Sequence, residues 1–166
     1  MIKSLFQNVL ILVNGSESSI HAVQYGILMA KLYRCNLKAV YVVDTATLKQ
    51  LTLSKFFVAD ESRSFEESLT RDGRRYLDYA VNLGKAKNIK IETELLSGSV
   101  GYEVIAAAER MHAGLILLGS CSSVTKNTAA VKHDAVSSSN QEILRSARCS
   151  VLVVKEENIE QLYKMG

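Results

Sequence analysis

The sequence predicts an α/β protein built on an open, doubly wound, five-stranded parallel sheet with helices on both faces. Short apolar runs alternate with longer segments in which apolar residues recur at helical spacing, which is typical of successive βαβ units. Several of the short runs are apolar at nearly every position, as strands are when helices cover both faces of the sheet. A chain of 166 residues is long enough for one domain with a single core.

Each element in the first half of the chain is predicted from its own residues. The run "NVLILV" (8–13) is apolar almost throughout and indicates a buried strand, and apolar residues at helical spacing predict a helix over 17–33. The run "NLKAVYVVD" (36–44) predicts a second strand. Residues 45–60 are irregular with room for one short helix, and charged residues with interleaved apolar positions predict a long helix over 61–87.

The second half supplies two more strand–helix pairs and a closing strand. The alternating run "IKIETELLSG" (89–98) predicts a less deeply buried strand, and residues 100–112 predict a helix. The run "GLILLGS" (114–120) predicts the fourth strand, which a polar loop and a short helix ending near Ser146 follow. The run "SVLVVK" (150–155) predicts the fifth strand.

The composition argues against several classes of protein. A net charge of +3 is too small to indicate nucleic-acid binding, and no apolar run approaches the roughly 20 residues of a membrane helix. The N-terminus lacks the small-residue cleavage site of a signal peptide, so we expect a cytoplasmic protein. Cys35, Cys121 and Cys149 form no CxxC pair and no metal-ligand pattern, which indicates free thiols.

Two loops are candidates for ligand binding. In doubly wound sheets, ligands bind beyond the carboxyl ends of the strands, where the strand order reverses. The loop "NGSESS" follows the first strand and the loop "GSCSS" follows the fourth. In the first loop, Ser16 is expected to be the N-cap of the next helix.

Four segments carry a resemblance to a known family: "ILVNGSESS", "VYVVD", "SGSVGYEVIAAAERMHAGLILLGS" and "EILRSARCSVLVVK". In this order and spacing they resemble the universal stress protein family over essentially the whole chain. The resemblance implies a Rossmann-like fold of the adenine nucleotide alpha hydrolase type, with strand order 3-2-1-4-5. It also implies dimers that pair through the last strand, and one subgroup of the family binds ATP.

The ATP-binding subgroup has a motif after the fourth strand: Gly, two residues, Gly, nine residues, then Gly-Ser or Gly-Thr. Gly119 matches the first position and Ser122 stands at the second, and alignment from the last strand places Ser137 and Ser138 at the closing pair. Fourteen residues then separate Ser122 from Ser137, five more than in the family motif, within a polar loop over 121–136. Two of the three glycines are therefore serine, although phosphate approaches backbone N–H groups most closely where no Cβ intervenes.

Two further positions match the part of the family site that holds adenosine. Asn14 stands where the family usually has aspartate, and its amide can both accept from and donate to a ribose or a base. Val42 matches the apolar position that packs against adenine. The resemblance thus implies ATP or AMP as the ligand, with a site made of Asn14, Val42, Gly119, Ser122, Ser137 and Ser138.

The residues leave more than one function open. One hypothesis is a dimeric sensor or adaptor that binds an adenine nucleotide, and the other is a dimerisation and interaction protein whose pocket is closed. A slow phosphohydrolase is a distant alternative, because His133 and Asp134 lie near Ser137 but no G-x-S-x-G elbow is present. Cys121 is interpreted as an incidental small residue rather than a redox centre.

The last strand is the expected contact between two copies of the chain. Residues 1–155 are expected to form the universal stress protein domain, and residues 156–166 a C-terminal tail. In strand order 3-2-1-4-5 the apolar strand at 150–155 lies at an edge, which a cytosolic protein has to cover. Pairing across a two-fold axis would cover it and make a homodimer. The tail is expected to cover the partner with three side chains, Ile159, Leu162 and Tyr163.

Overall fold

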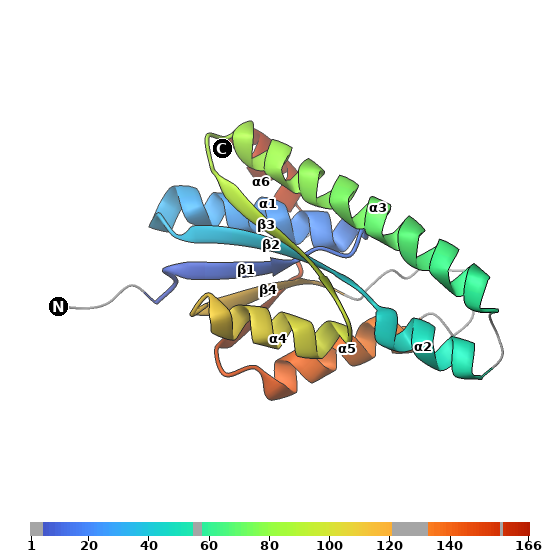
Figure 1. The fold of residues 1–166 in the computed structure, drawn as a ribbon. Coiled ribbons are helices and arrows are strands. Elements are labelled where there is room, and N and C mark those ends of the chain that lie inside the picture. The colour runs from blue at the N-terminus through green and yellow to red at the C-terminus, as the bar shows by residue number, and fades with distance from the viewer. Residues whose placement is uncertain (1–4, 55–57, 121–132, 157) are drawn as a thin grey trace.

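The computed structural model describes residues 5–54, 58–120, 133–156 and 158–166. Within these residues, five parallel strands form one sheet in the order β3-β2-β1-β4-β5, which confirms the predicted fold class and strand order (Figure 1). The strands are β1 (Asn8–Leu12), β2 (Asn36–Val43), β3 (Ile91–Ser97), β4 (Leu115–Gly119) and β5 (Ser150–Val154). The helices are α1 (Glu17–Tyr33), α2 (Thr45–Leu53), α3 (Ala59–Lys85), α4 (Val100–Arg110), α5 (His133–Ser146) and α6 (Ile159–Met165).

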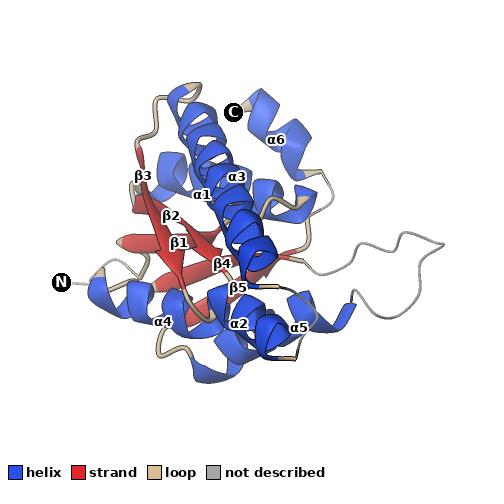
Figure 2. Ribbon diagram, turned by 45° about the vertical axis from the view of Figure 1, so that its right-hand side comes forward, coloured by secondary structure: helices blue, strands red, loops and turns tan. Residues whose placement is uncertain are grey.

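Helices cover both faces of the sheet, as Figure 2 shows with the strands in red between them. Helices α1, α3 and α6 lie on one face, and α4 and α5 lie on the other. Ile11 and Leu117 point into the core on the first face, and Leu10 and Ile116 point into the core on the second. All four side chains are fully buried, which explains why the central strands are apolar at successive positions. No helix in the described part of the chain is long and apolar enough to cross a membrane.

The short helix for which residues 45–60 have room is confirmed as α2, which Asp44 caps: its Oδ1 accepts from the Thr47 N–H at 3.0 Å and its Oδ2 from the Thr47 hydroxyl at 2.8 Å. Two other segments differ from the sequence predictions. Helix α5 begins at His133, inside the range predicted as a loop, and the rest of that loop lies outside the described residues. The C-terminal tail contains a helix that was not predicted, α6.

Helix α6 packs on its own chain. The Tyr163 hydroxyl donates to the Leu83 carbonyl of α3 at 2.7 Å, and the side chains of Ile159 and Tyr163 are 1% and 8% exposed. Leu162 remains 46% exposed. Two of the three side chains that were expected to cover a partner are therefore buried within this chain, because the amphipathic face of α6 lies on α1 and α3.

The two edges of the sheet differ in charge. Strand β3 carries Glu92 and Glu94, whereas β5 at the opposite edge has the sequence SVLVV. Glu94 contacts two cations: Lys38 Nζ lies 2.8 Å from its Oε2, and Arg110 Nη2 lies 2.9 Å from its Oε1. The hydrogen bond with Lys38, followed by the contacts with Arg110, holds the pKa of Glu94 below its ordinary value. One edge is thus polar and the other is apolar.

Candidate functional site

The candidate site lies where the strand order reverses, between β1 and β4. The chain runs from β1 to β2 and β3 on one side of this point, and β4 and β5 lie on the other. Ile11 of β1 pairs with Leu117 of β4, so the same register carried two residues further puts Val13 opposite Gly119. The loop that begins at Asn14 and the end of β4 therefore flank one spot at the carboxyl edge, which is where doubly wound sheets bind ligands.

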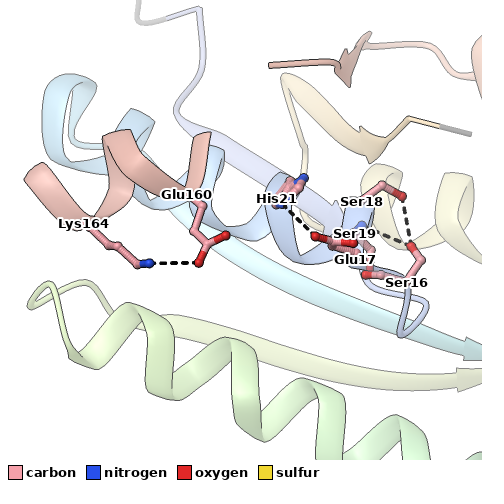
Figure 3. Close-up of polar contacts among 7 residues, drawn as sticks. All are labelled: Ser16, Glu17, Ser18, Ser19, His21, Glu160 and Lys164. Carbon is pink, nitrogen blue, oxygen red and sulfur yellow. Dashed lines mark hydrogen bonds and ion pairs between the residues drawn. The ribbon is translucent and has the colours of Figure 1, made fainter. Parts of the chain in front are cut away.

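The loop after β1 is held by the cap of α1. Asn14 Oδ1 accepts from the Ser16 N–H at 3.0 Å and from the Ser16 hydroxyl at 2.6 Å. Ser16 is the N-cap, as predicted: its Oγ accepts from the Ser19 N–H at 3.1 Å, and it lies 3.1 Å from the Ser18 hydroxyl (Figure 3). The Ser19 hydroxyl donates to the Ser16 carbonyl at 2.8 Å. Asn14 is exposed, and its Nδ2 has no partner among the residues that the structure describes.

An aromatic ring from α3 covers the same loop. Gly15 has φ +81°, and a Cβ there would lie 2.6 Å from Cε2 of Tyr76. The Tyr76 ring stacks on Tyr41 of β2, with 6.3 Å between ring centroids and 21° between ring planes. Burial raises the pKa of the Tyr41 hydroxyl, and the charges of Asp72 and Tyr76 raise it further, so this phenol stays protonated at neutral pH. Helix α3 thereby fixes the turn between β1 and α1.

Gly119 is the point at which β4, α1 and α5 meet. A Cβ there would lie 2.6 Å from the carbonyl carbon and oxygen of Ser18, and 2.7 Å from the backbone nitrogen of Ser19. These backbone atoms of the first turn of α1 cannot rotate aside as the tip of a side chain can. From the other face, Asn140 Nδ2 of α5 donates to the Gly119 carbonyl at 3.2 Å. Close packing against α1 is thus a sufficient reason for glycine at this position.

The structure describes the other predicted site residues to different extents. Val42 is only 8% exposed and packs in the core cluster of the α4–α5 face, near the carboxyl end of β2. Ser137 and Ser138 lie in α5, and their side chains are outside the described residues, as are Ser122 and Cys121 altogether. In a helix that begins at His133, the first four N–H groups have no carbonyl partner within the helix. The N–H groups of Ser137 and Ser138 come after these four.

Known proteins establish the family. The sequence pattern of the universal stress protein family matches residues 5–155. The chain belongs to the universal stress protein family. A universal stress protein of Methanocaldococcus jannaschii is 28% identical over 161 residues, which cover 95% of this chain and 87% of that one.

Solved structures of universal stress proteins share the fold. A family member from Burkholderia pseudomallei matches with a TM-score of 0.70 and 22% identity, covering 93% of this chain and 100% of that one. The universal stress protein from Archaeoglobus fulgidus in complex with dAMP matches with a TM-score of 0.59 and 14% identity, covering 92% of this chain and 100% of that one.

In this universal stress protein, the structure brings Asn14 and Gly119 together through the first turn of α1. The Asn14 N–H donates to the Ser19 hydroxyl at 3.3 Å, and Gly119 rests on the backbone of the same turn. Sequence reasoning missed two neighbours of this point, Tyr76 and Asn140. The sequence could have indicated Asn140, since it is a polar residue on the apolar face of a helix. It could not have indicated the contact of Tyr76 with Gly15, because that contact joins elements that are distant in the sequence.

Two observations concern metal-binding and nucleophilic groups in the described part of this universal stress protein. It contains no group of three or more His, Cys, Asp or Glu side chains that could hold a metal ion. Burial raises the pKa of the thiols of Cys35 and Cys149, which makes both weak nucleophiles at neutral pH.

Proposed function

We propose that this universal stress protein is a dimeric sensor or adaptor that binds an adenine nucleotide at the carboxyl edge between β1 and β4. One observation carries the proposal: Asn14 and Gly119, from the two strands at the point of reversal, flank a single spot, and the Asn14 amide is exposed there. Two solved universal stress proteins support it, one in complex with dAMP and one in complex with cAMP.

The ligand in this proposal is ATP or AMP. Asn14 Nδ2 donates to the ribose or the base, because its Oδ1 already accepts two hydrogen bonds from Ser16. Val42 contributes the small apolar surface that it leaves exposed. The N-terminus of α5 favours the negative charge of the phosphates, to which Ser137 and Ser138 contribute hydroxyl groups, and Ser122 completes the set.

A second copy of the chain belongs to the proposal because of β5. This edge strand has no charged residue, and Val151, Leu152 and Val153 are only partly buried against the core. An apolar edge with unpaired backbone groups is stabilised by pairing with another strand, and two copies of β5 do so across a two-fold axis. We place the dimer in the cytoplasm, where free thiols such as Cys35 and Cys149 stay reduced.

The second candidate function is a dimeric interaction protein that binds no nucleotide. The packing of Gly119 on Ser18 favours it, because the glycine is then required for the fold whether or not a ligand binds. The N-terminal cap of α1 also favours a function without a nucleotide, since the hydroxyls of Ser16 and Ser19 already form hydrogen bonds at this turn.

Titration of the purified protein with AMP and ATP distinguishes these functions. A ligand present at a hundred times its Kd stabilises the folded state by about 2.7 kcal/mol, which raises the Tm of a chain of this size by roughly 5–11 °C. Asn14→Ala is expected to weaken binding about fivefold, since one neutral hydrogen bond contributes about 1 kcal/mol. Asn82→Ala, an exposed asparagine on α3, is the matched control and should bind like wild type.

Three results would count against the nucleotide-binding proposal. An unchanged Tm at millimolar AMP and ATP, with no nucleotide in the purified protein, would favour the interaction protein. Equal loss of affinity in Asn14→Ala and Asn82→Ala would place the ligand elsewhere. Steady release of phosphate from ATP that stops on changing Ser138 would indicate a hydrolase instead.

A further inference from the structure

Asn140 is a buried polar residue on the apolar face of α5. Its side chain is 9% exposed, and Ile143, one turn further along the same face, is 0% exposed. An amide buried without a hydrogen bond costs about 1–3 kcal/mol, so an apolar residue is the expected choice at such a position. One hydrogen bond of this amide runs from Asn140 Nδ2 to the Gly119 carbonyl, at 3.2 Å.

This bond ties the end of β4 to the middle of α5. Gly119 is the last residue of β4, and Asn140 lies 21 positions later in the sequence. Because the peptide group is planar, holding the Gly119 carbonyl also fixes the direction in which the chain leaves β4.

Gly119 also contacts the first turn of α1, which is bonded to Asn14. On the side away from α5, Gly119 rests on the backbone of Ser18 and Ser19, and Ser19 accepts a hydrogen bond from the Asn14 N–H. Asn140, Gly119, Ser19 and Asn14 therefore form a continuous chain of contacts across the candidate site. Loss of the first contact frees the end of β4 from α5 while the cap of α1 stays intact.

We propose that Asn140 is a positioning residue for the adenine-nucleotide site, an inference that rests on the proposed function. It touches no ligand itself. It acts through Gly119, holding the end of β4 at a fixed place beside Asn14 so that the nucleotide meets a preformed edge. Preorganisation of this kind raises affinity because less ordering has to accompany binding.

The test compares substitutions at Asn140 with one at Ile143, using AMP as the probe in isothermal titration calorimetry. Asn140→Ala removes the donor, and Asn140→Asp keeps the shape but replaces the donor by a carboxylate. Each is expected to weaken AMP binding about tenfold, as loss of about 1.4 kcal/mol would. Ile143→Val also removes buried contact from this face and lowers the stability, but it should leave AMP affinity within about twofold of wild type.

A pH series separates positioning from a purely structural role. The new carboxyl group of Asn140→Asp is buried, so its pKa rises and it donates again once protonated. AMP affinity of Asn140→Asp should therefore recover relative to Asn140→Ala as the pH falls. Lower Tm values in both Asn140 variants with unchanged AMP affinity would overturn the inference alone. A wild-type protein that binds no AMP would overturn the proposed function, and this inference with it.

Discussion

Substitution of Gly119 by alanine separates a structural glycine from a ligand-binding one. The new Cβ would lie 2.6 Å from the Ser18 carbonyl carbon and oxygen, nearly 1 Å closer than ordinary van der Waals contact at 3.4 Å or more. Because all the opposing atoms are backbone, either the first turn of α1 or the end of β4 has to move. Overpacking of this kind costs about 1–3 kcal/mol, which corresponds to a fall in Tm of roughly 2–12 °C for a chain of this size.

Gly26→Ala is the matched control for this experiment. Its Cβ would lie 2.7 Å from Cδ1 of Ile11, which is the tip of a side chain and can shift. Gly26 is also inside α1, where alanine gains about 1 kcal/mol in helix propensity over glycine. The two effects oppose each other, so Gly26→Ala should remain within about 1 kcal/mol of wild type. Urea unfolding followed by circular dichroism measures both variants.

The refuting result is a Gly119→Ala protein that is as stable as wild type. The packing of β4 on α1 would then not require glycine at this position. If AMP binding were lost at the same time, the glycine would serve the ligand instead. A large loss of stability with unchanged AMP affinity would confirm that glycine is required at position 119 only for packing on α1.

Three further predictions concern other parts of the fold. The pKa of Glu94 is depressed in the folded state, so its contribution to stability is present above the ordinary value of 4.5 and is lost as the pH falls through the lower folded value. Between about pH 5 and 3, wild type should therefore lose stability more steeply than Glu94→Gln. Urea midpoints that fall in parallel for the two proteins would contradict this. Val153→Lys on β5 should give monomers in analytical sedimentation, whereas Thr93→Lys on β3, the opposite edge of the sheet, should remain dimeric. Dimers of both variants would indicate another interface. Tyr163→Phe should lower the free energy of unfolding by about 1 kcal/mol, because it leaves the part-buried Leu83 carbonyl without this donor. Tyr102→Phe, at a residue that is 67% exposed, should have no measurable effect in thermal unfolding, and equal effects of the two substitutions would mean that the hydroxyl bond does not stabilise α6.

The fold was predictable because its signal is local and periodic. Central strands such as β1 are buried on both faces, so their apolar runs are continuous, and the helices between them are long enough to show their spacing. Helix α6 was missed because it has only seven residues, too few for a periodic pattern to stand out. It is stabilised by contacts such as that of Tyr163 with Leu83, which no local pattern records.

The candidate site was predictable only in part. Resemblance to the family pointed to Asn14 and Gly119, which the structure brings to one spot. What holds them there depends on tertiary contacts, because Tyr76 and Asn140 reach the site from other helices through single side chains. The phosphate-binding role of Ser122, Ser137 and Ser138 stays a prediction, since the longer loop has no regular pattern from which its shape could be worked out.

The unequal edges of the sheet determine how far assembly through β5 can go. Once two copies pair along β5, each end of the joined sheet is a β3 strand that carries Glu92 and Glu94. A third copy would then have only β3 edges to join, and charged residues on an edge strand disfavour further strand pairing. In the proposed dimer, growth would therefore stop at two copies. If the proposed dimer forms, the charged residues of β3, a strand remote from the contact, would make the stoichiometry self-limiting and keep an open sheet from extending into a fibre.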